Sequence, residues 1–236
     1  MQPVRECVRA WKAELKELVL TESDSPKLAA LERFALAQGV PSVVRRSRGE
    51  MDRLARGAQH QGAITFAPPL VLAEWSNVLA RPNLLAVALD RIQDPQNFGA
   101  VVRSAVATGG AAILWGENAS APLTPATFRA SAGAIEHATL SRVASLPDAL
   151  IEARNSGIQV VGLSAQGDAL LSEVDLRSPT VLVLGGEGAG LQPSVRRACD
   201  RLAAIVRPTL LDSLNASVAI AIALYEAVKQ RANLNT

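Results

Sequence analysis

The sequence predicts an α/β fold in which a mostly parallel β-sheet carries helices on both faces, preceded by a smaller α/β unit. From residue 84 onward, short apolar runs of strand length alternate with stretches that have helical spacing. These runs are apolar almost throughout, as is typical of strands buried on both faces of a parallel sheet. Such sheets bind ligands at the carboxyl ends of their strands, so we expect the functional residues there.

Residues 1–66 predict the smaller unit, in which helices and short strands alternate. The second helix has the clearest signals, because Ser25 suits its cap, Pro26 its first position and Gly39 its end. The expected elements are a helix with Val4, Val8, Trp11, Leu15 and Leu18 at helical spacing, a strand at 17–21, a helix at 25–39, a strand at 41–46, a helix at 50–59 and a strand at 62–67. The Pro-containing stretch 67–83 is expected to be a linker.

Residues 84–236 predict the larger unit. The expected strands are 84–90, 111–116, 138–143, 159–165, 180–186 and 202–208. The expected helices are 97–109, 124–137, 146–157, 191–200 and a last one from Ala216 to Val228. The strict alternation of the two element types is what predicts the parallel sheet.

Composition speaks against several classes of protein. Hydrophobic residues make up 49% of the 236 residues, enough for a packed core. We expect no signal peptide, because the first twenty residues are charged throughout, and no membrane span, because Glu226 interrupts the apolar run near the C-terminus. Cys7 and Cys199 lie far apart, so neither a disulfide framework nor a zinc site is expected. These points lead us to expect a cytoplasmic protein.

The net charge of +2 is unevenly spread, with the excess of Lys and Arg in residues 1–66. Much of this excess is one cluster, formed by Arg45, Arg46, Arg48, Arg53 and Arg56. Such a cluster suits a polyphosphate partner such as RNA, but an ordinary solvated surface carries similar charges. Both interpretations stay open.

The first polar constellation follows the strand at 84–90. Asp94 can cap the next helix, and Gly99 allows another backbone to approach closely. Arg103 is expected to fold back over the first turn, where Asn97 lies, since helical side chains lean toward the N-terminus. This predicts a guanidinium oriented by an amide, although a surface arginine and a capping asparagine fit the segment as well.

The second constellation is the Gly-rich stretch "VLVLGGEGAGLQP", residues 181–193. A buried strand that runs into a Gly-rich loop and then a helix suits ligand binding through backbone N–H groups. It is not a Walker loop, because no Lys-Ser or Lys-Thr follows, and the glycine spacing is not that of a dinucleotide fingerprint. Glu187 would repel a phosphate, so a cationic or hydroxyl-bearing ligand fits better.

The third constellation opens the C-terminal helix. Asp212, Ser213 and Asn215 offer three polar side chains where one capping oxygen suffices. Either the helix is over-capped, or its N-terminus faces a ligand.

These three segments resemble the three motifs of the SpoU-type (TrmH-like) RNA 2′-O-ribose methyltransferases of the SPOUT superfamily. The matching residues are Asn97 and Arg103 in the first motif, Glu187 in the second, and Ser213 and Asn215 in the third. The intermediate segment 131–137, "SAGAIEH", is also similar, and the likeness spans residues 84–236. Three motifs in order are far more specific than any one of them.

The resemblance implies a fold, a cofactor and partners. The fold would include a deep trefoil knot formed by the C-terminal segment, and the assembly would be a homodimer. The cofactor would be S-adenosyl-L-methionine, with no metal and no membrane involved. Residues 1–66 resemble the small L30e-like RNA-binding domain of many members, with its opening strand clipped. That combination resembles the 23S rRNA guanosine-2′-O-methyltransferase branch more than the tRNA branch.

The resemblance also implies roles for single residues. The cofactor contacts would fall on Gly185, Ile205 and Leu214. The polar catalytic roles would fall on Asn97, Arg103, Glu187, Ser213 and Asn215. Because an arginine rarely loses its proton, we expect Arg103 to hold the substrate phosphate and stabilise alkoxide character, and not to act as a base.

The third motif departs from the family pattern. Val206 and Arg207 stand where a Pro-Met pair is usual, and Thr209 stands where a glycine is usual. A β-branched residue cannot easily adopt positive φ, so we expect a reshaped cofactor pocket. Three alternatives stay open: a non-catalytic RNA-binding relative, a tRNA ribose methyltransferase, and a nucleotide-dependent enzyme of another α/β class, which Glu187 disfavours.

Overall fold

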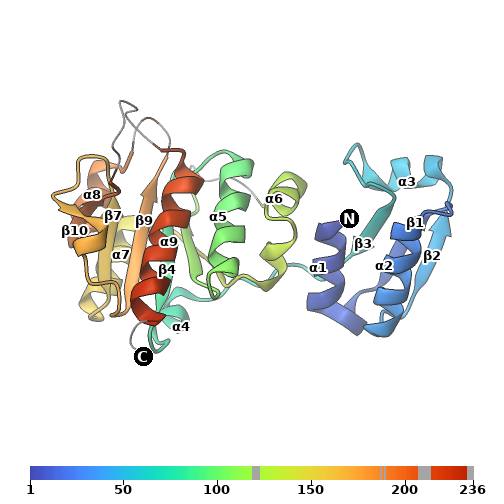
Figure 1. Cartoon of the computed structure of the whole chain (residues 1–236), viewed down its shortest axis with the longest axis horizontal. Coiled ribbons are helices and arrows are strands. Elements are labelled where there is room, and N and C mark those ends of the chain that lie inside the picture. Colours follow the sequence, from blue (N-terminus) through green and yellow to red (C-terminus); the bar gives the residue numbers. More distant parts are fainter. Residues whose placement is uncertain (119–122, 187, 189, 207–213, 233–236) are drawn as a thin grey trace.

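A computed structural model describes residues 1–118, 123–186, 188, 190–206 and 214–232 of the chain. Within these residues the strands form two sheets, one of three strands and one of seven. Figure 1 shows the sheets in two lobes, with the smaller sheet formed by the N-terminal part of the chain. The predicted α/β fold with its large parallel sheet is confirmed.

The smaller sheet has the order β2-β1-β3, in which β2 is parallel and β3 antiparallel to β1. Its elements are α1 (Gln2–Trp11), η1 (Lys12–Glu14), β1 (Glu17–Thr21), α2 (Pro26–Ala37), β2 (Val43–Arg46), α3 (Arg48–Ala55) and β3 (Ala63–Phe66). Leu18 and Leu20 of β1 pack against α1 and α2 in one core. Val19 points to the opposite face and is buried there, on the side where α3 contacts β1. Gly39 ends α2 with a φ of +82°, as predicted.

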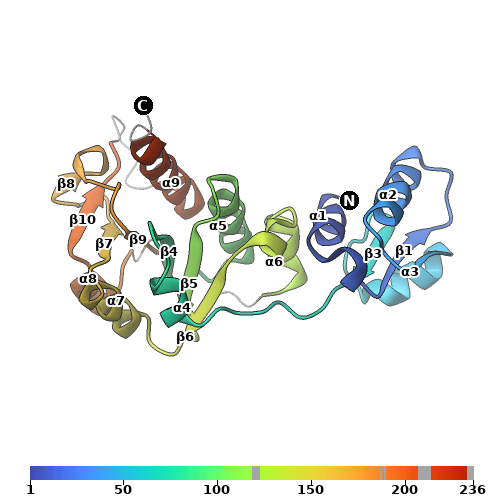
Figure 2. The same cartoon turned by 90° about the horizontal axis from the view of Figure 1, so that it is seen from below.

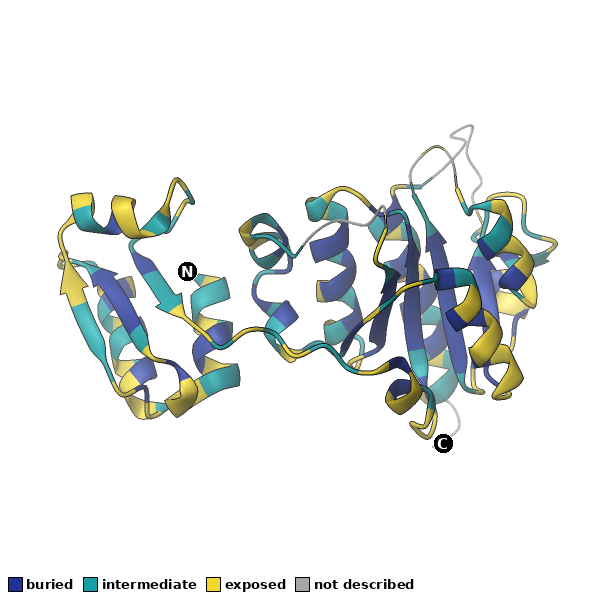
Figure 3. Cartoon of the chain, turned by 180° about the vertical axis from the view of Figure 1, so that it is seen from behind, coloured by how far each residue is buried: buried dark blue, intermediate teal, exposed yellow. Residues whose placement is uncertain are grey.

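The larger sheet has the order β6-β5-β4-β9-β7-β10-β8, and every pairing of neighbours in it is parallel. Its strands are β4 (Leu85–Asp90), β5 (Ala112–Gly116), β6 (Leu140–Val143), β7 (Gln159–Leu163), β8 (Ala169–Leu170), β9 (Thr180–Gly185) and β10 (Arg201–Ala204). Figure 3 shows these strands largely buried. All six predicted strands are present, and β8 is an additional two-residue strand that the sequence did not predict.

Helices cover both faces of the larger sheet, as Figure 2 shows. These helices are α4 (Trp75–Leu79), α5 (Pro95–Ala107), α6 (Pro125–Ala130), α7 (Leu146–Asn155), α8 (Pro193–Ala198) and α9 (Ala216–Ala232). Strand alternation sends Val87 and Leu89 of β4 into the core under α5 and α9, and Ala86 and Ala88 into the core under α4, α7 and α8. The run 84–90 is apolar throughout because both of its faces are covered.

Gly99 of α5 lies against α6. A Cβ at Gly99 would lie 2.5 Å from Cβ of Ala130 and 2.7 Å from the carbonyl oxygen of Thr127. The predicted close approach at Gly99 is therefore confirmed, and the segment that approaches it is α6.

Several local predictions differ from the structure. The first helix, expected to include Leu15 and Leu18, ends at Trp11, and Leu18 lies in β1. The helix expected over 124–137 is interrupted after α6, because Ala132 and Gly133 adopt positive φ before a short 3₁₀ helix, η2 (Ala134–His137). The expected linker contains α4, whose buried Trp75 donates from Nε1 to the carbonyl oxygen of Ala149 (3.1 Å). The strand expected over 202–208 is β10, which ends at Ala204. The burial of Trp75 is a tertiary contact that local propensity does not predict.

The two lobes contact each other through α1 and η2. Nε1 of Trp11 donates to Oε2 of Glu136 (2.7 Å), and Nε2 of His137 lies 3.1 Å from Oε2 of Glu6. Gly133 has a φ of +86°, and a Cβ there would lie 2.7 Å from Cβ of Glu6. The segment "SAGAIEH" thus joins the lobes, and its glycine is required by a close approach as well as by its φ.

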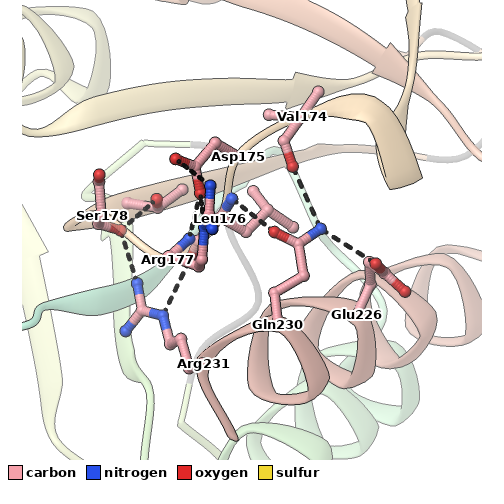
Figure 4. A network of polar contacts seen from close by, with 9 residues as sticks. Val174, Asp175, Leu176, Arg177, Ser178, Glu226, Gln230 and Arg231 are labelled. Carbon is pink, nitrogen blue, oxygen red and sulfur yellow. Dashed lines mark hydrogen bonds and ion pairs between the residues drawn. The ribbon is translucent and has the colours of Figure 1, made fainter. Parts of the chain in front are cut away.

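The C-terminal end of α9 is held by a polar network, shown in Figure 4. The guanidinium of Arg231 donates to the carbonyl oxygens of Asn83, Leu84, Leu176 and Ser178, at 2.8 to 3.1 Å. The neighbouring Gln230 accepts from the backbone N–H of Leu176 and donates to the carbonyl oxygen of Val174. These bonds satisfy backbone groups of two connecting segments and fix the last helix to them. Among the described helices, none combines the length and hydrophobicity that a membrane span needs.

Candidate functional site

A cavity of about 670 Å³ lies at the carboxyl ends of β7, β9 and β10, beside the start of α9. Gly185, Ile205, Leu214 and Asn215 all line it. The first three are the residues on which the family resemblance implies cofactor contacts. Gly185 comes from the second motif, and Ile205 and Leu214 come from the third. The structure therefore brings the second and third motifs together at the edge of the sheet where ligands of this fold class bind.

The loop after β9 folds back on itself. Gly186 and Gly190 form an antiparallel bridge, in which the N–H of Gly190 donates to the carbonyl oxygen of Gly186 (3.1 Å). A Cβ at Gly185 would meet the backbone of Gly190 and would lie 2.5 Å from the backbone nitrogen of Leu191. Only glycine fits there, because the returning strand of the loop occupies the space of a side chain. Glu187, which carries the predicted catalytic role in this loop, lies outside the described residues.

A buried carboxylate connects this loop to the end of β4. Asp90 is 2% exposed, and its side chain accepts from the backbone N–H of Gln192 (2.6 Å) and from Nε2 of Gln192 (2.8 Å). These two charge-assisted hydrogen bonds tie Gln192, the N-cap residue of α8, to the end of β4, the strand that precedes the first motif. The sequence analysis did not single out Asp90, although an acidic residue at the end of an apolar strand could have signalled it.

The first and third motifs are joined by a direct hydrogen bond. Nδ2 of Asn215 donates to Oδ1 of Asn97 (3.1 Å). Oδ1 of Asn215 accepts from the backbone N–H of Ser217 (3.0 Å), from Oγ of Ser217 (2.6 Å) and, at 3.4 Å, from the backbone N–H of Val218. Asn215 therefore caps α9 with its oxygen and reaches the first motif with its nitrogen. Ser213 and Asp212 lie outside the described residues.

The cap at the start of α5 is formed as predicted, because the Asp94 side chain accepts from the backbone N–H of Gln96 (2.9 Å).

Arg103 lies on the exposed side of α5 and is not part of the cavity wall. Arg103 lies six positions after Asn97. In a helix this separation corresponds to about 9 Å along the axis and to side-chain directions that differ by about a third of a turn. The guanidinium thus faces solvent beside the site, where it can meet a large substrate but not the interior of the cavity.

Three polar residues of the cavity wall were not singled out by the sequence analysis: Ser164, Gln166 and Arg196. Ser164 and Gln166 follow β7, where the backbone N–H of Gln166 donates to Oγ of Ser164 (3.2 Å). Of the residues that depart from the family pattern, Val206 is 63% exposed, and Arg207 and Thr209 lie outside the described residues. The expected reshaping of the pocket at Thr209 therefore stays a prediction.

Neither Cys7 nor Cys199 lines the cavity. Burial, followed by the nearby charge of Asp200, raises the pKa of Cys199 to about 12. Burial, followed by the charge of Glu136, raises the pKa of Cys7 as well. Both thiols therefore stay protonated at neutral pH. Across the described part of the chain, no group of three or more His, Cys, Asp or Glu side chains is arranged to hold a metal ion.

Comparisons with known proteins identify relatives of this architecture. The family model described as the SpoU rRNA Methylase family matches residues 84–225. A curated protein of Mycolicibacterium gilvum, named as an uncharacterized tRNA/rRNA methyltransferase, is 38% identical over 97% of this chain and 74% of its own length.

Two solved structures extend the comparison. The SpoU methyltransferase AviRb from Streptomyces viridochromogenes, in complex with the cofactor AdoMet, is 27% identical with a TM-score of 0.77, over 98% of this chain and 88% of AviRb. The TrmH/SpoU tRNA modifying enzyme of A. aeolicus is 30% identical with a TM-score of 0.59, over 68% of this chain and 82% of that protein. Likeness to AviRb thus extends over both lobes.

Proposed function

The chain belongs to the SpoU rRNA methylase family of RNA methyltransferases, and from this premise we propose that it methylates a ribose 2′-hydroxyl of structured RNA, with 23S rRNA as the expected substrate. S-adenosyl-L-methionine is the methyl donor in this proposal. The observation that carries it is the single cavity formed by the segments of the second and third motifs, beside the Asn97–Asn215 bond to the first.

The cavity suits the donor in size and in the character of its wall. Its volume of about 670 Å³ lies within the range of roughly 300–1,000 Å³ that small-molecule sites occupy. Gly185, Ile205 and Leu214 would hold the donor through backbone groups and aliphatic side chains. The packed glycine loop would let the backbone lie close to the donor. When bound, the donor supplies a methyl group on a sulfonium, which is already activated for displacement.

The protein's own contribution would be positioning. In the reaction the ribose 2′-oxygen forms a bond to the methyl carbon as the carbon–sulfur bond breaks, and the hydroxyl proton is released. Holding two reactants in line can supply about 7–11 kcal/mol of the barrier. The Asn97–Asn215 bond would fix the start of α5 against the start of α9. The target ribose and the methyl donor would then be held in a constant position relative to each other.

Arg103, Glu187 and Ser213 take the remaining catalytic roles in this proposal. The exposed guanidinium of Arg103 would hold the phosphate beside the target ribose and stabilise negative charge that develops on the 2′-oxygen. It would act as a cation and a hydrogen-bond donor throughout, and not as a base. Glu187 and Ser213 would order the second and third loops around the donor.

RNA binding is proposed for residues 1–66, as a small L30e-like domain, with 67–83 as a linker and 84–236 as the methyltransferase domain. The Arg45 and Arg46 side chains face Glu32 (2.7 Å) and Glu50 (3.9 Å). Arg48, Arg53 and Arg56 are exposed and form no ion pair with any described residue. These three arginines are therefore the ones we expect to contact RNA phosphates.

A homodimer and a C-terminal trefoil knot complete the proposal. On α9, Val218, Ile222 and Tyr225 are 46%, 38% and 65% exposed, and their spacing puts them on one face of the helix. An exposed apolar stripe beside a functional site suits a subunit interface.

The proposed knot is supported by the path of the chain, because β10 lies beyond β7 in the sheet whereas α9 packs back on α5 and β9. We place the protein in the cytoplasm.

Calorimetric titration with S-adenosyl-L-methionine, followed by transfer of a labelled methyl group to rRNA and to tRNA transcripts, tests the proposal. Donor binding with ribose methylation of rRNA is the expected result. Methylation of tRNA alone would favour the tRNA ribose methyltransferase. RNA binding without donor binding would favour the non-catalytic relative.

A further inference from the structure

Arg196 stands on one side of the cavity, across from the start of α9. Val195 and Ala198 of α8 belong to the core on one face of the larger sheet, whereas Ala216 of α9 belongs to the core on the other face. The cavity at the strand ends is thus bordered by Arg196 on one side and by Leu214 and Asn215 on the other. Any ligand that fills it lies between these two helices.

The cavity wall is nearly uncharged. Among its described residues, Arg196 is the one with a charged side chain. Asp200, four positions after Arg196, is already engaged, since its Oδ1 accepts from Nε of Arg154 (2.7 Å) and its Oδ2 accepts from the backbone N–H of Val160 (2.8 Å). Within the described part of the chain, the guanidinium of Arg196 forms neither an ion pair nor a side-chain hydrogen bond. Its donors are therefore available to a ligand.

We propose that Arg196 binds the carboxylate of the methyl donor's amino-acid moiety; this inference rests on the proposed function. The donor carries a sulfonium, an ammonium and a carboxylate at neutral pH, so the carboxylate is the group that a guanidinium attracts. The same guanidinium repels the two cationic groups. Arg196 therefore sets the direction of the donor, with the carboxylate toward α8 and the methyl group toward α9 and the Asn97–Asn215 pair. It is a binding and positioning residue.

The test compares two ligands that differ in the amino-acid moiety. S-adenosylhomocysteine carries the carboxylate, and 5′-methylthioadenosine lacks it. By calorimetry, Arg196→Ala should weaken binding of S-adenosylhomocysteine about tenfold, because a charge-assisted hydrogen bond at a partly exposed site is lost. The affinity for 5′-methylthioadenosine should not change. Arg197→Ala is the matched control, because Arg197 is the next residue of the same helix, is exposed and does not line the cavity. It should change neither affinity.

Each outcome separates the inference from the proposed function. If the wild-type protein binds S-adenosylhomocysteine but Arg196→Ala leaves its affinity unchanged, or weakens both ligands equally, the inference is overturned while the proposed function stands. If the wild-type protein binds neither ligand nor S-adenosyl-L-methionine, the proposed function fails and the inference fails with it. Arg196→Gln, which keeps most of the side-chain length, replaces Arg196→Ala if that variant does not fold, with the same selective loss expected.

Discussion

Nδ2 of Asn215 donates to Oδ1 of Asn97 across 3.1 Å, joining residues 118 positions apart in the sequence. The oxygen of the same Asn215 amide caps α9 by accepting from Ser217 and Val218. One side chain therefore performs two tasks, stabilising a helix and connecting two motifs, and substitutions can separate them.

Asn215→Asp should retain the cap and lose the connection. Aspartate caps helices as well as asparagine does, but it would place an oxygen against Oδ1 of Asn97 in place of a donor. We expect near-normal thermal stability with a large loss of methyl transfer. Asn215→Ala should lose both, with a destabilisation of about 1 kcal/mol from the missing cap. Thermal denaturation and single-turnover transfer rates would measure the two effects, and full activity of Asn215→Asp would refute the connecting role.

Gly185→Ala should disrupt the loop after β9. The added Cβ would meet the backbone of Gly190 and Leu191, which cannot move without breaking the Gly186–Gly190 bridge. We expect donor affinity to fall by more than about tenfold, because backbone atoms of this loop line the cavity.

Gly188→Ala is the matched control for the loop. Gly188 also lines the cavity and has a φ of +78°, but no described residue beyond its chain neighbours lies within 4 Å of its Cβ position, so alanine there costs backbone strain of about 1 kcal/mol and displaces no backbone. Isothermal titration of both variants should show a much smaller loss for Gly188→Ala. Equal losses would mean that the close packing at Gly185 does not shape the donor site.

Arg231→Ala should destabilise the fold without altering the site. The substitution removes a donor from four backbone carbonyls, at a cost of about 2–3 kcal/mol. The carbonyl oxygens of Leu84 and Ser178 keep a second donor from Thr180, whereas those of Asn83 and Leu176 lose the donor that Arg231 supplies. Arg177→Ala is the control, because its ion pair with Asp175 lies in the same segment but is exposed to solvent, which screens it. Urea denaturation at neutral pH would compare the two, and similar midpoints would contradict the anchoring role of Arg231.

Cys199 should make the protein more sensitive to alkaline pH. Burial and the charge of Asp200 raise its pKa to about 12 in the folded state, whereas an unfolded thiol ionises near pH 8.5. A group whose folded pKa is raised contributes stability that is complete below about pH 8.5 and is lost as the pH rises toward 12. Cys199→Ser keeps a donor for the carbonyl oxygen of Val195 and should flatten this loss. If the stability of the wild type and of Cys199→Ser fell in parallel as the pH rises, Cys199 would not be the cause of the alkaline loss.

The sequence predicted the fold well because its signals are local. The apolar runs, the Asp94 cap, the Gly39 helix end and the close approach at Gly99 each depend on a few neighbouring residues. That Gly185, Ile205 and Leu214 would share one site was implied by the family resemblance, and its place at the strand ends agrees with the rule for parallel sheets.

What the sequence did not predict depends on contacts between distant segments. The bonds from Gln192 to Asp90 and the place of Arg196 on the cavity wall follow from the packing of α8 against α7 near the end of β4, which no local pattern records. The helix α4 is short, and its burial depends on Trp75 reaching Ala149. Arg103 lies on the exposed side of α5 because the buried side of that helix is set by the sheet beneath it.

Mapping of ribose 2′-O-methylation in the rRNA of a deletion strain tests the central claim most directly. Loss of one 2′-O-methylated nucleotide from 23S rRNA is the expected result, with restoration by the wild-type gene but not by Arg103→Ala, whose purified protein still binds the donor. An unchanged set of 2′-O-methylated rRNA nucleotides would contradict the account.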